Sequence, residues 1–277
     1  MTAPSFDEIL KIEQVGEDLF EGATAPGAFA AAGPAIFGGQ LVAQALLAAG
    51  NTAPDKIRHS LHAYYARPGD IALPVTYEVV RVRDGRSFST RQVTARQRGV
   101  VVLLFMASFK HPEAGPAHQG EMPEAPSPDD PKVNTGRLFF DTPSFRSVPM
   151  ELRRIVPEAV PAPPGHPPMQ RFWFRAKAPI TGGEAMQAAA LAYISDIALL
   201  ATPMLPHGDK FAAGKGVSSS IDHALWFHRP TDVGEWHLYD QVSPTADDAR
   251  GFALGSIWRA DGTLVATAAQ EGLMRSG

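Results

Sequence analysis

The apolar residues of the first 110 positions form one long run followed by several short alternating runs. The long run, residues 37–50, is apolar on nearly all sides and stops at Gly50 and Asn51, which predicts a buried helix. Four runs typical of β-strands follow it, at residues 58–66, 75–82, 87–96 and Val100–Lys110. Turn residues such as Asp84 and Gly85 separate these runs, so the pattern predicts a helix followed by an antiparallel meander.

The second half of the chain repeats this order. A helix is predicted at residues 184–203, and strand-like runs follow at residues 217–227, 235–242, 251–259 and 263–274. The sequence YYARPGD at 64–70 matches WFHRPTD at 226–232. A second match, RSFS against RGFA, falls in the same order with nearly the same spacing, which indicates a duplication.

A proline-rich stretch separates the two halves. Residues 111–170 hold 14 of the 25 prolines, and so many fixed φ angles exclude long regular elements there. We expect an extended connector at 111–170 with a short helix near residues 147–155. The predicted domains are therefore 1–110 and 171–277, with this connector between them.

A long apolar helix followed by an antiparallel meander is buried most simply when the sheet curls around the helix. The predicted fold is α+β: a tandem (double) hotdog, in which each half is a long central helix wrapped by an antiparallel sheet. We expect the two sheets to join edge to edge, because that removes two exposed strand edges.

Composition narrows the possible partners. The hydrophobic fraction is 44%, the charged fraction 19% and the net charge −4, so there is no basic field to hold nucleic acid. The longest apolar run, near residues 100–106, is too short to span a membrane, and neither end of the chain resembles a targeting signal. We therefore expect a cytoplasmic protein that binds neither nucleic acid nor membrane.

Redox and metal chemistry find no support in the sequence. The chain has no cysteine, which excludes disulfides, thiolate metal sites and a cysteine nucleophile. His59 and His62 lie three apart in a predicted strand and so point to opposite faces; His223 and His228 also differ by an odd number. We expect no metal and no cofactor.

Three polar residues interrupt apolar elements. Asp196 lies in the second predicted helix, Ser220 at the start of an apolar strand, and Gln270 in the last strand. Taken singly, each fits a hydrogen-bonded structural role, and Gly38-Gly39-Gln40 fits a tight entry into a buried helix. If the helix and strands pack as predicted, Asp196, Ser220 and Gln270 meet at one seam between helix and sheet.

Several blocks of sequence resemble the type II acyl-CoA thioesterase (TesB-like) family, over nearly the full chain. The blocks, in order, are FGGQ at 37–40, HSLHAYY at 59–65, RPGD at 67–70, RDGRSF at 83–88, SD at 195–196, IDHALWFHRP at 221–230 and QEGLMR at 270–275. The resemblance implies a double-hotdog hydrolase in which Asp, Thr or Ser, and Gln hold a water for attack on the thioester of a fatty acyl-CoA. These roles fall on Asp196, Ser220 and Gln270, with Ser220 where many members have Thr.

Two other functions stay open at this point. A hotdog hydratase or dehydratase needs an Asp/His or Glu/His pair at the α-carbon, but Asp222 and His223 are adjacent and face opposite sides of a strand. A non-catalytic acyl-CoA-binding protein would have no need to keep Asp, Ser and Gln together. We also expect a homo-oligomer, because tandem hotdogs commonly pair again through their free sheet edges.

Overall fold

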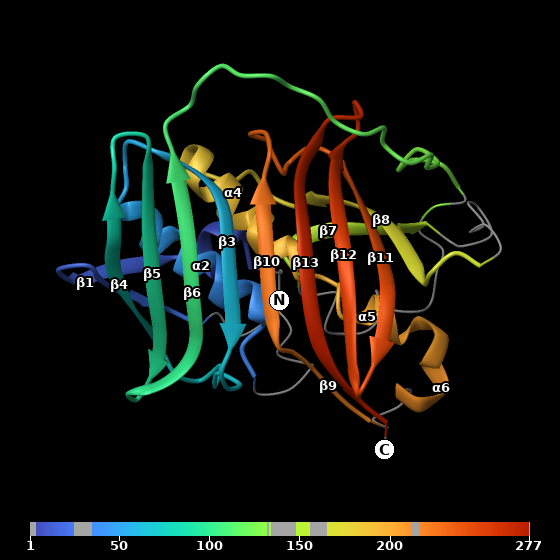
Figure 1. The fold of residues 1–277 in the computed structure, drawn as a ribbon, viewed down its shortest axis with the longest axis horizontal. Helices are drawn as coiled ribbons and strands as arrows, with labels where there is room; N and C mark the ends of the chain where they lie inside the picture. Colours follow the sequence, from blue (N-terminus) through green and yellow to red (C-terminus); the bar gives the residue numbers. More distant parts are fainter. Residues whose placement is uncertain are drawn as a thin grey trace.

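The computed structural model describes residues 4–24, 35–131, 133, 148–155, 165–211 and 216–276. Their strands form one 13-stranded sheet in the order β1-β2-β4-β5-β6-β3-β10-β13-β12-β11-β8-β7, with β9 paired to β13 (Figure 1). All the pairings are antiparallel. Within the described residues, no helix is long and apolar enough to cross a membrane.

The first half follows the predicted order of one helix and four strands. Its main helix is α2 (Gly38–Asn51), and its strands are β3 (Ile57–Tyr65), β4 (Val75–Asp84), β5 (Phe88–Gln97) and β6 (Val100–Lys110). A short helix and a hairpin that we did not predict precede them: α1 (Phe6–Ile9), β1 (Ile12–Gly16) and β2 (Leu19–Gly22).

The second half repeats the arrangement with more interruptions. Its strands are β7 (Met150–Ile155), β8 (Met169–Ala176), β9 (Val217–Ser220), β10 (Asp222–Phe227), β11 (His237–Asp247), β12 (Arg250–Arg259) and β13 (Leu264–Arg275). Its helices are α4 (Gly183–Ser195), α5 (Ala201–Met204), the 3₁₀ helix η2 (Leu205–His207) and α6 (Gly208–Phe211).

The two halves join through β3 and β10, which pair from Asp222 opposite Tyr64 to Trp226 opposite Ser60. This confirms the predicted edge-to-edge joining of the sheets. The strand order is mirrored about this pair: β3-β6-β5-β4-β2-β1 runs one way and β10-β13-β12-β11-β8-β7 the other. The outer hairpin β7–β8 thus occupies the place in the second half that β1–β2 occupies in the first.

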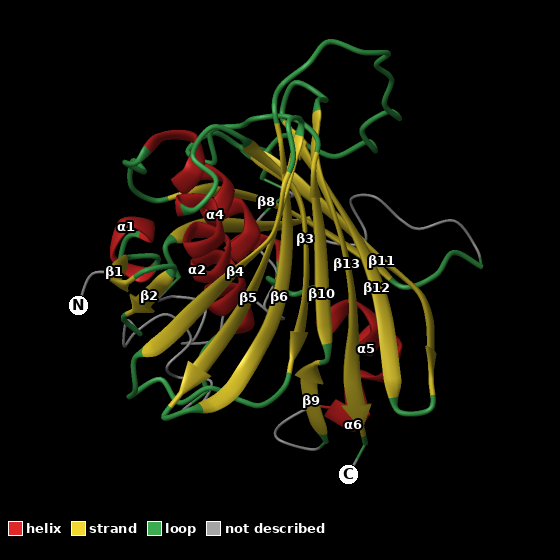
Figure 2. Ribbon diagram, turned by 60° about the vertical axis from the view of Figure 1, so that its left-hand side comes forward, coloured by secondary structure: helices red, strands yellow, loops and turns green. Residues whose placement is uncertain are grey.

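Helices α2 and α4 lie together on the concave face of the curved sheet (Figure 2). Most of α2 is buried, including polar Gln40 and Gln44, and α4 is buried from Ala188 to Ser195. Gln44 is paired inside the core, where its amide donates to the carbonyl of Ile9 at 2.9 Å and accepts from the Tyr77 hydroxyl at 2.7 Å. The all-round apolar pattern of the two helix segments is explained by burial against both the sheet and each other.

Three predictions of secondary structure were wrong. The expected helix near residues 147–155 is instead strand β7, which pairs with β8 and carries an ion pair from Glu151 to Arg175 at 2.9 Å. The expected helix at 184–203 ends at Ser195, because the chain turns through Ala198 with a positive φ of 60° before α5 begins. The single strand expected at 217–227 is interrupted at Ile221, and β9 pairs only with β13 among the described strands.

Gly39 sets how closely α2 approaches α4. A Cβ atom at this position would lie 2.5 Å from the backbone oxygen of Tyr193 and against the Phe37 ring. We expect Gly39→Ala to lower the free energy of unfolding by about 1–3 kcal/mol, because the helices must move apart. Gly50→Ala, near the other end of α2, is the control, because its Cβ would meet no atom nearer than 3.8 Å. Denaturant unfolding of both variants tests this, and equal stability would contradict it.

Candidate active site

Two of the three residues singled out in the sequence, Asp196 and Ser220, are each hydrogen-bonded to the third, Gln270. Asp196 caps the C-terminus of α4, Ser220 ends β9, and Gln270 lies in β13. The Gln270 side-chain nitrogen donates to Asp196 Oδ1 at 2.6 Å and to Ser220 Oγ at 2.9 Å. The helix and the two strands therefore meet at the predicted seam.

The start of α2 closes one side of this cluster. The backbone N–H of Gly39 donates a hydrogen bond to the Asp196 carboxylate. A Cβ at Gly38 would lie 2.9 Å from Asp196 Oδ2 and equally close to the Tyr65 hydroxyl, so only glycine lets the backbone approach this closely. A helix N-terminus also carries partial positive charge, which favours a carboxylate beside it.

Burial controls the protonation of Asp196. The side chain is almost fully enclosed, and burial raises the pKa of Asp196 from 3.8 to about 6, against the lowering effect of the bonds from Gln270 and Gly39. Asp196 is thus ionised at neutral pH but has a pKa close enough to neutrality to accept and release a proton readily.

The orientation of the Gln270 amide follows from its partners. A carboxylate only accepts hydrogen bonds, so the amide nitrogen must face Asp196. The amide oxygen, Oε1, then points away from Asp196; it is buried and accepts no hydrogen bond from the described residues. The cluster thereby presents a carboxylate, a hydroxyl and a free amide oxygen, which can together position one small polar molecule.

Tyr65 is a site residue to which the sequence assigned no role. Its hydroxyl is buried without a hydrogen-bond partner among the described residues, and it approaches the same point above Gly38 as Asp196 Oδ2. Burial, together with the negative charges of Asp196 and Asp222, raises the pKa of Tyr65 well above its ordinary value. Tyr65 is therefore a neutral hydrogen-bond donor beside the cluster. The periodicity of the sequence could not indicate this position, because β3 reaches the cluster only through its pairing with β10.

The adjacent Asp222 and His223 do not form a catalytic pair. Asp222 Oδ1 accepts from the backbone N–H of Glu271 at 2.7 Å, whereas the buried His223 ring contacts Ser195 Oγ at 2.8 Å. Burial lowers the pKa of His223 to about 4, so the ring is neutral at pH 7. Within the described part of the chain, no cluster of three or more His, Asp or Glu residues could hold a metal ion.

Two family models match most of the chain. The model of the acyl-CoA thioesterase N-terminal domain matches residues 25–110, and that of the acyl-CoA thioesterase C-terminal domain matches residues 116–274. Acyl-coenzyme A thioesterase 8 of Rattus norvegicus is 38% identical, over 97% of this chain and 88% of the relative.

Solved structures give the same result for the fold. The acyl-CoA thioesterase II TesB2 of Mycobacterium marinum is 35% identical and aligns with a TM-score of 0.84, over 98% of this chain and 97% of that one. A hot dog fold protein of Alicyclobacillus acidocaldarius, 21% identical, aligns with a TM-score of 0.77 over 98% of each chain. The fold of this chain is therefore a hotdog fold.

The raised pKa of Asp196 has a consequence for stability. The folded-state pKa of about 6 exceeds the ordinary value of 3.8, so protonated Asp196 stabilises the folded state relative to the unfolded state. This stabilisation is lost as the pH rises from about 4 to above 6. The difference between the two pKa values corresponds to about 3 kcal/mol. Relative to wild type, Asp196→Asn should therefore gain up to this much stability between pH 4 and pH 7.5. Denaturant unfolding at both pH values measures the gain, and the absence of any relative gain would show that burial of the carboxylate carries little cost.

Proposed function

The chain belongs to the acyl-CoA thioesterase family, and on that premise we propose that Asp196, Ser220 and Gln270 hold the water that attacks the thioester. The enzyme hydrolyses acyl-CoA thioesters. The observation that carries the residue assignment is the Gln270 amide group, which bridges a buried carboxylate and a hydroxyl at 2.6 and 2.9 Å beside the start of α2.

In the proposed mechanism, water donates one hydrogen bond to the Asp196 carboxylate and another to Gln270 Oε1, while Ser220 fixes its position. As the water oxygen bonds to the thioester carbonyl carbon, its proton passes to Asp196. The tetrahedral intermediate then collapses with cleavage of the C–S bond, and the thiolate of CoA takes the proton from the protonated Asp196 side chain. The carboxylic acid and CoA leave, and Asp196 is ionised again. No covalent enzyme intermediate is needed, because a thioester is activated enough for an oriented water.

Charge on the carbonyl oxygen needs a donor in the transition state. Tyr65 supplies one in this proposal, because its buried hydroxyl is neutral, has no partner among the described residues and lies beside Asp196. The same burial that keeps Tyr65 neutral also excludes bulk water, which strengthens any hydrogen bond made there.

We propose a double hotdog for the whole chain. The mirrored strand order about β3 and β10 supports two units, at 1–110 and 171–277, joined by a connector at 111–170. Strand β7 and the first residues of β8 fall within the connector range and add an outer hairpin to the second unit.

The substrate in this proposal is a fatty acyl-CoA, and the enzyme works in the cytoplasm as a homo-oligomer. Exposed apolar side chains on the strands at and near the β3–β10 junction support self-association; they are Tyr64, Leu104, Met106, Trp226 and Leu254. An apolar patch of this kind on a sheet is commonly covered by another copy of the same chain.

Replacing Asp196 by Asn tests the proposed base. Asn keeps the shape and the hydrogen bond from Gln270 but cannot take the proton, so kcat should fall by about 10²-fold or more. For wild type, kcat/KM should fall about tenfold per pH unit below pH 6, because protonation of Asp196 (pKa about 6) removes the acceptor. Steady-state release of CoA from acyl-CoA between pH 4.5 and 8 measures both effects. A kcat near wild type in the Asn variant would remove Asp196 from the mechanism.

Ser220 is tested by a series at one position. If the hydroxyl orients the water, Ser220→Ala should lower kcat about tenfold or more with little change in KM. Ser220→Thr should keep substantial activity, because the hydroxyl remains and the methyl group restricts its rotation. Ser219→Ala is the matched control, because Ser219 is exposed and, among the described residues, its hydroxyl donates only to the backbone oxygen of Ser220. Equal kcat in Ser220→Ala and Ser219→Ala would assign Ser220 a purely structural role.

A further inference from the structure

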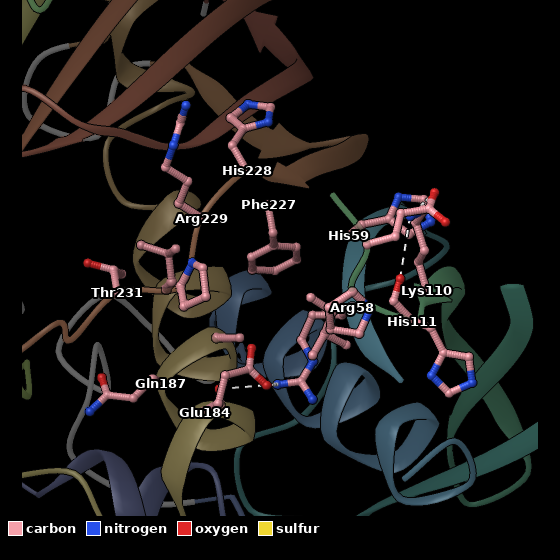
Figure 3. A pocket seen from close by; sticks show the side chains of 16 residues that line it. Arg58, His59, Lys110, His111, Glu184, Gln187, Phe227, His228, Arg229 and Thr231 are labelled. Atoms are coloured by element: carbon pink, nitrogen blue, oxygen red, sulfur yellow. Dashed lines mark hydrogen bonds and ion pairs between the residues drawn. The ribbon is translucent and has the colours of Figure 1, made fainter. Parts of the chain in front are cut away.

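A cavity of about 280 Å³ lies at the opposite end of α4 from Asp196 (Figure 3). It is bounded by the first turns of α4, the start of β3, the end of β6 and the segment after β10. Glu184, which lines it, precedes Asp196 by twelve residues, a rise of about 18 Å along α4, and Leu191, its lining residue nearest to Asp196 on that helix, precedes Asp196 by five.

The two halves of the chain repeat the same order of elements, and this cavity lies at the positions equivalent to those of the candidate active site. Arg67 and Arg229 occupy equivalent places, because their backbone N–H groups lie 3.5 and 3.4 Å from the carbonyls of Val102 and Val265. Counting nine residues back from each arginine places Arg58 in the position of Ser220. The strand pairing gives the same correspondence, because Arg58 lies opposite Phe109 of β6 and Ser220 lies opposite Gly272 of β13.

The positions equivalent to Asp196 and Gln270 also carry different residues at this end. Thr52 caps the C-terminus of α2, where Asp196 caps α4. Ala107 stands two residues before Phe109, where Gln270 stands two residues before Gly272. The positions equivalent to Asp196 and Gln270 therefore carry neither a carboxylate nor an amide. A glycine pair, Gly182 and Gly183, again begins the helix, here with positive φ at both residues.

Arg58 gives this cavity a different chemistry. Its side chain is only 8% exposed, and its Nη1 lies 2.8 Å from the Glu184 carboxylate and 3.1 Å from the Glu184 carbonyl oxygen. Its Nε is buried and donates to no partner among the described residues. Its Nη2 also has no hydrogen-bond partner among the described residues and, unlike Nε, is not enclosed, so it can donate to an added anion.

The remaining lining limits which anion fits. Ile57, Ala188, Leu191 and Phe227 supply apolar surface, and Figure 3 shows the Phe227 ring among the lining side chains. The other charged and titratable side chains that line the cavity are His59, Lys110, His111, Glu113, His228 and Arg229. Lys110 is paired with Glu113 at 2.5 Å and Arg58 with Glu184, so among the lining lysine and arginine side chains Arg229 alone has no ion pair with a described residue. One unpaired cation favours a singly charged anion over a di- or triphosphate.

We propose that this cavity is a non-catalytic site for a carboxylic acid with an aliphatic chain, the chemical class that the enzyme itself releases. The carboxylate accepts from the Arg58 guanidinium, through Nη2, and the chain lies against Leu191 and Phe227. A volume of about 280 Å³ lies just below the usual range for small-molecule pockets, which restricts the site to short or medium chains.

Octanoate is the probe, titrated by calorimetry into the full-length enzyme at pH 7.5. Arg58→Gln should weaken the binding of octanoate about tenfold or more, and Arg58→Lys should restore part of it. Octanol, which has a similar chain and no carboxylate, should bind wild type at least tenfold more weakly. Thioesterase kcat should be unchanged in both Arg58 variants, which also reports that they fold.

The active site is a second place where octanoate can bind, and Asp196→Asn together with Ser220→Ala separates the two. The proposal requires that the Arg58-dependent binding persists in both of these variants. The proposal is overturned if octanoate does not bind at millimolar concentration. It is also overturned if the Arg58 variants bind octanoate like wild type while the Asp196 or Ser220 variant loses binding, or if CoA alone competes for the Arg58-dependent site as strongly as octanoate does. None of these results bears on the proposed role of Asp196 in hydrolysis, which is measured separately by kcat.

Discussion

The antiparallel pairing of β3 with β10 is the interaction on which the rest of this structure depends. It converts two separate sheets into one and removes an exposed edge from each. It also brings α2 and α4 side by side on the same concave face, where neither helix could be buried by its own half alone. The candidate active site lies where the start of α2 meets the end of α4, so it is built from both halves and requires this pairing.

A buried carboxylate in such a seam is tolerated only with close partners. Asp196 has two, the Gln270 amide and the Gly39 N–H, and both keep its pKa from rising further than about 6. The two glycines at the start of α2 are therefore part of the chemistry as well as of the packing. Their lack of side chains lets a helix N-terminus contact the carboxylate directly.

Much of this arrangement could be predicted because it rests on local patterns. The helix near residues 37–50, the four strands after it and the edge-to-edge joint all follow from periodicity and from the duplicated segments. Strand β7 could not be predicted, because six residues among prolines have no clear period and are held by pairing with β8. The role of Tyr65 was missed for a related reason: its position beside Asp196 arises from contacts between halves that are far apart in sequence.

In the proposed double hotdog the two halves share an order of elements and differ in chemistry. Each end of the helix pair has the same kinds of element: a glycine pair at the start of one helix, a capping residue at the end of the other, and two strands beside them. At one end these positions carry Asp196, Ser220 and Gln270; at the other they carry Thr52, Arg58 and Ala107. A chain that folds as one polypeptide can vary the two ends independently, which two identical subunits cannot do. Since the shared core depends on the helices and the β3–β10 joint, the second end can carry a buried guanidinium in place of the Asp196 cluster without loss of the fold.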